Sequence, residues 1–301
     1  MLGHRGPFSC MPDSVPACRS GILAAMHDIT SHTLRGVEVL SLCDAVGPMA
    51  GSLGAPVTEK FPNAAPELWP DLRIAEPTLF TSGDHWILHF HCFLLRDATG
   101  RNVLVDTGIG TASSPAADWA PVPGRLLDAL ADEAGLAPSD IDVVVLTHLH
   151  SDHAGGCVTD GEPVFPNARH IVQQAEVDWL ARTASSPILG SVVDPLRRAG
   201  ALDTLHGPLR LAEFVDLVPT PGHTPGHQSI VVDDHRLVIA GDVVLHPVQL
   251  IDPSIHYLHD ENPQTAATTR TTLLNEIRTR NGLLAAPHLP HPFIELHPHH
   301  P

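Results

Sequence analysis

One short segment of the chain places four potential metal ligands within six residues. It reads THLHSDH over residues 147–153, and it directly follows an apolar run at residues 141–146. Such a run predicts a buried strand, and the two glycines at 155 and 156 predict a sharp turn toward a helix. The motif is therefore expected at the carboxyl end of a strand. Imidazole and carboxylate groups together favour Zn, Fe, Mn or Co over Mg or Ca.

Three later segments also place a polar side chain directly after an apolar stretch. Residues 219–227 read PTPGHTPGH, residues 237–242 read LVIAGD, and residues 283–288 read LLAAPH. Each pattern predicts a strand that ends in a turn. The chain has 22 histidines, so some lie near one another by chance. Chance does not readily produce H-x-H-x-D-H directly after a strand.

The order of these motifs resembles the metallo-β-lactamase superfamily of hydrolases. The resemblance covers roughly residues 85–296 and rests on the H-x-H-x-D-H, T-P-G-H-T-P-G-H and Gly-Asp motifs and on the late histidine. It implies an α+β fold, namely an αββα sandwich of two face-to-face mixed sheets with outer helices. It also implies a dinuclear metal site, because no ligand position of the family is missing here.

The resemblance assigns the metal ligands position by position. His148, His150 and His223 would hold the first metal; Asp152, His153 and His288 would hold the second; and Asp242 would bridge the two. Two such cations, about 3.5–4 Å apart, would lower the pKa of a bridging water toward neutrality. Two divalent ions are therefore expected, zinc first, with Fe, Mn or Co as alternatives. Asp152 or Asp242 would accept the proton of the nucleophile.

Further residues are assigned to support these ligands. Asp106 follows the strand predicted at 103–105, and in the family the equivalent aspartate orients ligands without binding metal. An aspartate there can also cap the following turn through its own backbone. His227 is expected to pack or to support the site, and His291 competes weakly with His288 for the last ligand position.

The segment after Asp242 resembles the branch that contains acyl-homoserine lactone lactonases and methyl-parathion-type organophosphate hydrolases. The homoserine-lactone enzymes often carry a tyrosine soon after the bridging aspartate, whereas this chain has Leu245 and His246 there. Its only tyrosine is Tyr257, so a phenolic donor at that site is in doubt. His246 is a catalytic candidate, since a histidine can donate a proton near neutral pH. Packing beneath the loop is the equal alternative.

The expected reaction is therefore opening of an ester bond by a metal-bridging hydroxide, with a lactone as the leading substrate. Organophosphate or aryl-ester hydrolysis is the alternative, and thiolester hydrolysis is less favoured because residues that would hold glutathione carboxylates are not evident. A metal-binding protein with a decayed site is the non-enzymatic alternative. The expected partner is a small-molecule ester or lactone, and the family makes a homodimer plausible.

Composition excludes several other classes. The chain has 34 acidic and 17 basic residues, a formal charge of −17 and a single lysine, Lys60, which argues against nucleic-acid binding. Five cysteines without C-x-x-C spacing suit a reducing cytoplasm. No apolar run approaches the roughly 18 residues that a membrane span needs. The first 25 residues lack the long apolar core of a signal peptide.

Three regions are expected along the chain: a disordered extension at 1–30, one hydrolase domain at 31–296 and a disordered tail at 297–301. Strands are predicted at 37–42, 86–95, 102–105, 170–173, 228–233 and 237–240, and helices at 123–135, 174–181 and 263–281. His89 and His91 are expected as strand residues. The Pro/Gly-rich segment 44–80 is expected to lack regular structure and, through Phe61, Leu68 and Trp69, to form a pocket wall or a dimer interface.

Overall fold

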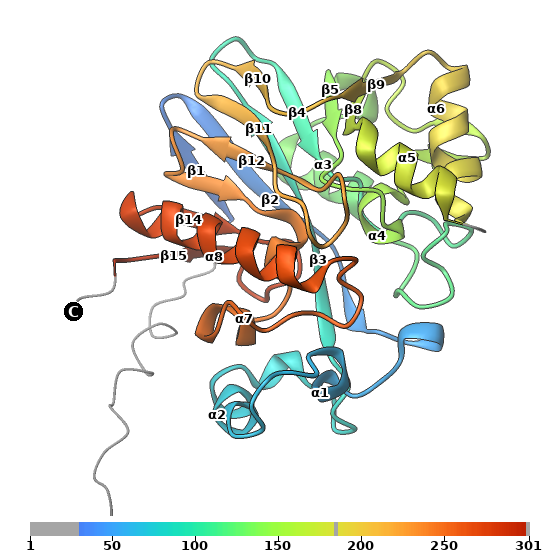
Figure 1. Cartoon of the computed structure of the whole chain (residues 1–301). Helices are drawn as coiled ribbons and strands as arrows, with labels where there is room; N and C mark the ends of the chain where they lie inside the picture. The colour runs from blue at the N-terminus through green and yellow to red at the C-terminus, as the bar shows by residue number, and fades with distance from the viewer. Residues whose placement is uncertain (1–29, 184–185, 299–301) are drawn as a thin grey trace, which may run out of the picture.

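Two β-sheets form the centre of the molecule in a computed structural model that describes residues 30–183 and 186–298 (Figure 1). The first sheet contains, in spatial order, β1 (Ser31–Leu34), β2 (Val37–Pro48), β3 (Ile87–Arg96), β4 (Asn102–Val105), β5 (Val143–Val145), β8 (Arg169–Gln173) and β9 (Leu202–Leu205). Strands β1 to β4 pair antiparallel, whereas β4, β5, β8 and β9 pair parallel. This sheet is mixed, as the sequence predicted.

The second sheet is also mixed. It contains, in spatial order, β10 (Leu209–Ala212), β11 (Val215–Pro219), β12 (Gln228–Val232), β13 (Leu237–Ile239), β14 (Leu283–Ala285) and β15 (Phe293–Glu295). Only β13 and β14 pair parallel, and the long helix α8 (Pro263–Thr279) connects them. A parallel pair needs such a crossover, because the chain must return to the same end of the sheet.

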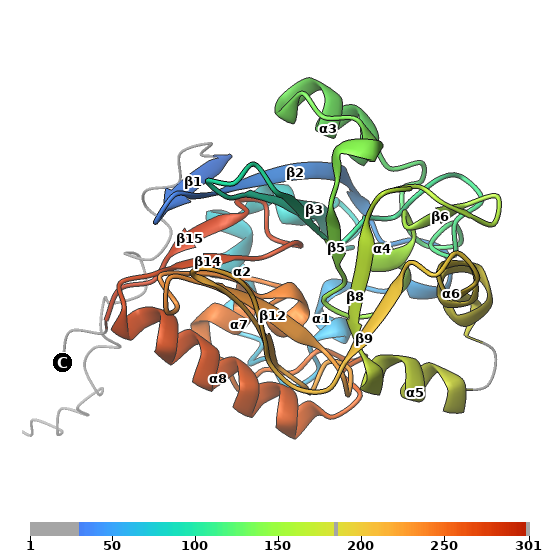
Figure 2. The same ribbon diagram turned by 90° about the horizontal axis from the view of Figure 1, so that it is seen from above.

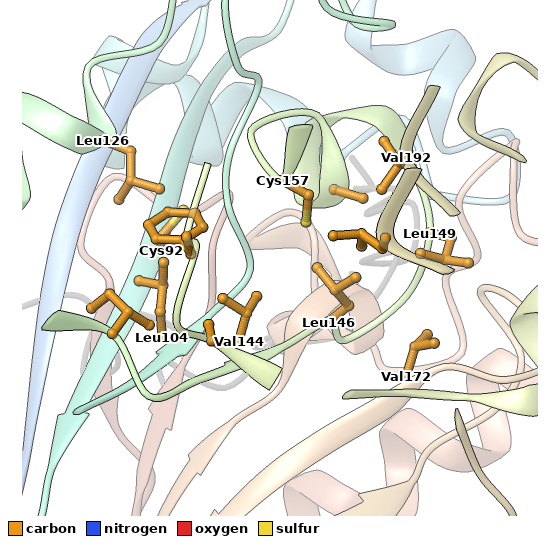
Figure 3. Packing of buried hydrophobic residues seen from close by; sticks show 14 of the residues in the cluster. Cys92, Leu104, Leu126, Val144, Leu146, Leu149, Cys157, Val172 and Val192 are labelled. Carbon is orange, nitrogen blue, oxygen red and sulfur yellow. The ribbon is translucent and has the colours of Figure 1, made fainter. Parts of the chain in front are cut away.

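The alternation of side chains along β3 shows how the layers are filled. Phe93 and Leu95 lie in the core between the two sheets, whereas Cys92 and Leu94 lie on the opposite face. On that outer face they join Leu126 of α3 (Leu126–Ala134) in a second apolar cluster (Figure 3). Both faces of β3 are therefore buried, which explains its nearly continuous apolar sequence.

Helices cover the outer faces of both sheets. Figure 2 shows α3 and α8 on opposite sides of the sandwich. Leu273, Leu274 and Ile277 of α8 pack on the outer face of the second sheet. The helix begins where the Asn262 side chain accepts a hydrogen bond from the Thr265 amide at 3.0 Å, and Pro263 occupies its first turn. The layer order α, β, β, α confirms the predicted fold class.

The remaining α-helices and strands are short. They are α1 (Val57–Lys60), α2 (Leu68–Ala75), α4 (Ser151–Ala154), α5 (Gln174–Arg182), α6 (Asp194–Arg198), α7 (Val248–Ile251) and the small hairpin of β6 (Val158–Thr159) and β7 (Glu162–Pro163). Within the described ranges, no helix has the length and apolarity needed to cross a membrane. The extension and tail expected at 1–30 and 297–301 fall almost entirely outside the described residues.

The expectation of an irregular segment at 44–80 was wrong. Strand β2 continues to Pro48, and α1 and α2 follow it. The sequence pattern hid the end of the strand because Asp44 is polar yet only 1 % exposed. Its carboxylate accepts hydrogen bonds from the amides of Ile109 and Leu126, each at 2.8 Å. A buried acid that serves two backbone donors looks, in sequence, like a surface residue.

Candidate metal centre

The predicted ligands come together at one end of the two sheets. His148 and His150 follow β5, Asp152 and His153 lie in α4, and His223 lies between β11 and β12. Asp242 occupies a 3-10 turn after β13, and His288 follows β14. Each ligand therefore lies in a loop, a short turn or a short helix that follows a strand. The irregular backbone there lets several side chains point toward one place.

The donor atoms form two groups. The first consists of His148, His150, His223 and Asp242, and the second of Asp152, His153 and His288; within each group all donor atoms lie within 4.8 Å of one another. These are the two sets that the resemblance implied. His291, the competing candidate, belongs to neither group among the described residues.

Asp242 faces both groups with different oxygens. Its Oδ2 lies 3.2 Å from His223 Nε2 and 3.7 Å from His148 Nε2. Its Oδ1 lies 3.1 Å from His153 Nε2 and 3.3 Å from His288 Nε2. One oxygen toward each set of imidazoles is the arrangement that a bridging carboxylate requires.

The spacing of the donors suits small divalent cations. In the first group, His150 Nδ1 lies 2.9 Å from His148 Nε2 and 3.0 Å from His223 Nε2. A tetrahedral zinc with ligands at 2.0–2.1 Å would separate neighbouring donors by about 3.3 Å. Where Asp242 faces the second group, its buried Oδ1 and the buried His153 Nε2 form no hydrogen bond within the described residues. Such unpaired buried atoms are costly, and a bound cation would satisfy both.

Hydrogen bonds fix the ring orientations in the second group. Asp106 Oδ2 accepts a bond from His153 Nδ1 at 2.8 Å, and the same carboxylate accepts the Thr147 amide and hydroxyl, each at 2.8 Å. His288 Nδ1 donates to the backbone oxygen of His89 at 2.8 Å. Each bond places the proton on Nδ1 and leaves Nε2 free to bind. Asp106 thus contacts a predicted ligand, as the sequence suggested.

A carboxylate that the sequence did not reveal supports the first group. Asp260 Oδ1 accepts a hydrogen bond from His223 Nδ1 at 2.9 Å, and its Oδ2 accepts the Tyr257 amide at 2.9 Å. The guanidinium of Arg270, fully buried, lies 3.7 Å from Asp260 Oδ2. Arg270 also donates to the backbone oxygens of Val243 and Ile255, each at 2.6 Å. One helix residue therefore secures the loops on both sides of α7.

His227 lies beneath Asp242. Its Nε2 accepts a hydrogen bond from the Asp242 amide at 3.0 Å, so Nδ1 carries the proton and donates to Thr220 Oγ1 at 2.9 Å. A Cβ on Gly241, whose φ is +54°, would lie only 2.6 Å from His227 Nε2. This contact explains the glycine before Asp242. His227 belongs to neither donor group in the described part of the chain.

Burial and charge act in opposite directions on these histidines. Burial, with neighbouring imidazoles, holds the pKa of His148 and of His150 well below the usual range. Burial also opposes a charge on His223, but Asp242 and Asp260 outweigh it and raise the pKa to about 9. Burial lowers the pKa of His227 to about 3, so this ring is neutral. The carboxylates thus favour positive charge between the donor groups.

A cavity of about 500 Å³ opens above the donor groups. Five of the predicted ligands form its floor, namely His150, Asp152, His223, Asp242 and His288. Its apolar wall consists of Met49, Leu53, Leu88, Trp119, Leu245, Tyr257 and Leu258. The Trp119 indole donates to Ser151 Oγ at 3.2 Å, beside Asp152. The segment 44–80 thus contributes Met49 and Leu53 to the wall. Phe61, Leu68 and Trp69 are buried behind the wall and are not among the residues that line the cavity.

His246 is enclosed by aromatic rings and does not line the cavity. It is fully buried, with ring centroids of Phe61, Trp86 and Trp69 at 5.2, 5.3 and 5.6 Å. Its Nδ1 accepts the Val248 amide at 3.2 Å, and burial lowers its pKa to about 3. The structure therefore favours the packing alternative for His246. Tyr257, the residue that sequence reasoning set aside, lines the cavity instead.

Comparisons with known proteins agree with this arrangement. A family model described as the metallo-beta-lactamase superfamily matches residues 91–288. An N-acyl homoserine lactonase from a Bacillus species is 30 % identical over 177 residues, covering 55 % of this chain and 65 % of the relative. The Bacillus cereus N-acyl homoserine lactonase is 27 % identical, covering 54 % and 66 %. The matched segment therefore spans slightly less than two thirds of these relatives.

Solved structures share the fold at lower identity. AidC, described as a dizinc quorum-quenching lactonase with the product N-hexanoyl-L-homoserine, superposes with a TM-score of 0.70 at 20 % identity, covering 90 % of this chain and 97 % of AidC. The hydrolase AbOPH superposes with a TM-score of 0.69 at 23 % identity and the same coverage. The family model covers more than half of the chain and includes all seven predicted ligands. The chain belongs to the metallo-beta-lactamase superfamily.

Proposed function

We propose that this protein is a dinuclear metal-dependent hydrolase that opens lactones. The observation that carries the proposal is the position of Asp242, which turns one oxygen toward each donor group on the floor of a cavity with an apolar wall. The lactonase activity named for the Bacillus relatives supports the choice of substrate.

The chain's own residues would divide the work as follows. The seven ligands would hold two divalent ions, zinc first, with Fe, Mn or Co as alternatives. When bound, such ions polarise a substrate oxygen and lower the pKa of a water molecule. Asp152 lines the cavity, and its Oδ2 lies 3.4 Å from His288 Nε2 and 3.5 Å from His153 Nε2. Asp242 lines the cavity as well, so either of these two carboxylates would accept the proton of the nucleophile.

Tyr257 supplies the hydroxyl that the sequence lacked after Asp242. Its ring stacks on His223 with centroids 6.2 Å apart, and its amide is held by Asp260. Burial, followed by the charges of Asp152 and Asp242, raises the pKa of the phenol well above its usual value. The hydroxyl therefore stays protonated and can donate a hydrogen bond to the substrate carbonyl or to the departing alkoxide.

Tyr257→Phe tests this role. Loss of one donor to a developing oxyanion lowers turnover by about 10²-fold in comparable sites. We expect a fall of that order in kcat, with little change in KM and two metals still bound, measured by steady-state kinetics and elemental analysis. Phenylalanine keeps the stacked ring, so an unchanged kcat would remove Tyr257 from the mechanism.

The wall of the cavity favours an uncharged substrate. Among the described residues that line it, none is lysine or arginine, and Glu261 adds an acid at its edge. A glutathione thiolester carries carboxylates that would find no lysine or arginine partner in this lining, whereas an acyl lactone carries no carboxylate. Trp119 and Tyr257 also offer ring faces to an aryl group, which keeps aryl-ester or organophosphate hydrolysis as the second candidate.

The deciding experiment is acid release by the zinc-loaded protein from acyl lactones of increasing chain length, beside an aryl ester, a phosphotriester and a thiolester. We expect kcat/KM for lactones to exceed the others by at least tenfold. A panel led by the aryl ester or the phosphotriester would support the second candidate and withdraw the lactonase assignment. Within the part of the chain that the structure describes, Cys43, Cys92 and Cys157 form no disulfide. This supports a reducing compartment, and we propose the cytoplasm.

A further inference from the structure

A buried carboxylate outside both donor groups joins the two ligand loops of the first group. Glu176 is the third residue of α5 and is fully buried. Its Oε2 accepts the Leu149 amide at 3.1 Å, and its Oε1 accepts the Gly226 amide at 2.7 Å. Leu149 lies between His148 and His150, and Gly226 lies between His223 and His227 in the chain.

The two loops belong to different sheets. The loop with Leu149 follows β5 of the first sheet, and the loop with Gly226 precedes β12 of the second. Gln228 reinforces the same junction, because its side-chain amide donates to the Leu146 oxygen at 2.8 Å and its backbone amide to the Thr147 oxygen at 2.9 Å. Glu176 therefore lies where the two halves of the sandwich must keep a fixed spacing. Figure 2 shows α5 at this end of the sheets.

Glycines allow helices to approach the second loop closely. A Cβ on Gly226 would lie 2.5 Å from the Glu176 amide nitrogen, and a Cβ on Gly222 would lie 2.3 Å from the Ala266 amide nitrogen of α8. The loop is thus held between α5 and α8. The T-P-G-H-T-P-G-H motif therefore has glycine at these two positions because a larger side chain would collide with a neighbouring helix.

A carboxylate is a costly means of joining two loops. Burial raises the pKa of Glu176, and the Thr224 side chain together with the two amide bonds only partly offsets this effect. A neutral side chain would be easier to bury but has no second acceptor oxygen with which to hold both amides. The cost of burying a carboxylate argues that Glu176 is there to hold the two loops in place and not to stabilise the fold.

We infer that Glu176 is a positioning residue that sets the 3.0 Å separation between His150 Nδ1 and His223 Nε2. It acts through the main chain of both loops and touches neither imidazole. The inference rests on the proposed metal centre and not on the identity of the substrate. On this inference, Glu176 increases the affinity of the first group for its metal. The ligands of the second group are oriented by Asp106 and the His89 carbonyl and do not depend on Glu176.

The test compares Glu176→Gln and Glu176→Asp with Asp178→Asn. Glutamine keeps the size but loses one acceptor, and aspartate keeps the charge but loses reach. Asp178 is an exposed acid on the same helix whose side chain bonds only Gln174 among the described residues, and it serves as the matched control. The measurements are stepwise Zn²⁺ affinity by chelator competition and the visible absorption of the Co²⁺-loaded protein, with circular dichroism to establish folding.

We expect both Glu176 variants to bind the first-group metal 10- to 100-fold more weakly, with an altered Co²⁺ spectrum, while the second position and the Asp178→Asn control stay as in the wild type. Wild-type affinity in Glu176→Gln would overturn the inference. Wild-type affinity in Glu176→Asp alone would also overturn it, since charge rather than reach would then matter. If neither variant folds, Glu176 is required by the fold itself and the positioning role fails.

These measurements need no substrate, so they separate the inference from the proposed function. A wild-type protein that binds two metals and hydrolyses no lactone would refute the lactonase proposal and leave the role of Glu176 standing. If the wild type binds two metals and both Glu176 variants keep its affinities, the role of Glu176 is refuted and the lactonase proposal stands.

Discussion

The two donor groups share Asp242 but are supported in different ways. In the first group, His223 is oriented by the side chain of Asp260, and its loop is joined to that of His150 by Glu176. In the second group, His153 is oriented by Asp106, whereas His288 is oriented by the main-chain oxygen of His89. The first group depends on side chains from outside the sheets, whereas the second depends partly on a main-chain oxygen of β3, which no side-chain substitution removes.

This difference teaches that the two metal positions should respond to different mutations. The supports of the first group come from α5 and from the loop before α8, which lie outside both sheets. The supports of the second group come from β3 and from the residue after β4, inside the first sheet. Substitutions can therefore weaken one position at a time, with Asp242 as the exception.

The largest effect is expected for Asp242→Ala. The substitution removes both oxygens that face the donor groups, and four imidazoles lose the carboxylate that they share. We expect loss of both metals at micromolar zinc and loss of hydrolysis, measured by elemental analysis after gel filtration and by the lactone assay. Retention of one metal at full occupancy would show that the two groups are more independent than the shared aspartate implies.

A crossed pair of variants sharpens the comparison. Asp106→Asn should weaken the second position and Asp260→Asn the first, each by 10- to 100-fold, because outer carboxylates orient and polarise ligand histidines. Asparagine suits position 106, where φ is +60°, since it tolerates left-handed backbone. Stepwise zinc titration of both variants measures the two affinities. An equal loss at both positions in either variant would contradict separate support.

The smallest effect is expected for His246→Phe. The ring lies among aromatic side chains, so turnover should be unchanged, and loss of the Val248 bond should cost about 1 kcal/mol of unfolding free energy at neutral pH. The folded pKa of about 3 lies below the unfolded value of 6.5, so the wild type loses stability as the pH falls below 6.5. Between pH 6 and 4, the unfolding free energy of the variant should therefore fall by about 1.4 kcal/mol less per pH unit than that of the wild type.

Chemical unfolding of the metal-free protein at several pH values measures this slope. A reduction in kcat with metal content intact would instead return His246 to the mechanism.

The sandwich and the clustering of the predicted ligands were expected from the family resemblance, and local patterns placed the ligand motifs at the ends of strands. An apolar run followed by a turn marks each strand end, and the ligand motifs sit directly on those ends. The close approach of two helices to one loop was not visible in the same way. Gly222 and Gly226 indicate a need for space, but only the structure shows that α8 and α5 occupy it.

The supporting acids could not be predicted for a related reason. Glu176 and Asp260 look like ordinary surface residues of a helix and a loop, and their partners are backbone amides and a histidine far away in sequence. A weak signal existed at Arg270, which falls on the apolar stripe of α8 with Ala266, Leu274 and Ile277. A buried arginine is rarely found without an acidic partner, and here that partner is Asp260.

The seven ligand side chains lie in loops that follow strands of both sheets. This arrangement links metal supply in the cell to the stability of the protein. Ions that bind there would tie the two halves of the sandwich together, and unfolding would have to release them. At a free metal concentration 100 times the dissociation constant, one such ion adds about 2.7 kcal/mol to the unfolding free energy. Metal starvation would then reduce the amount of protein through faster degradation, in addition to silencing the copies that remain.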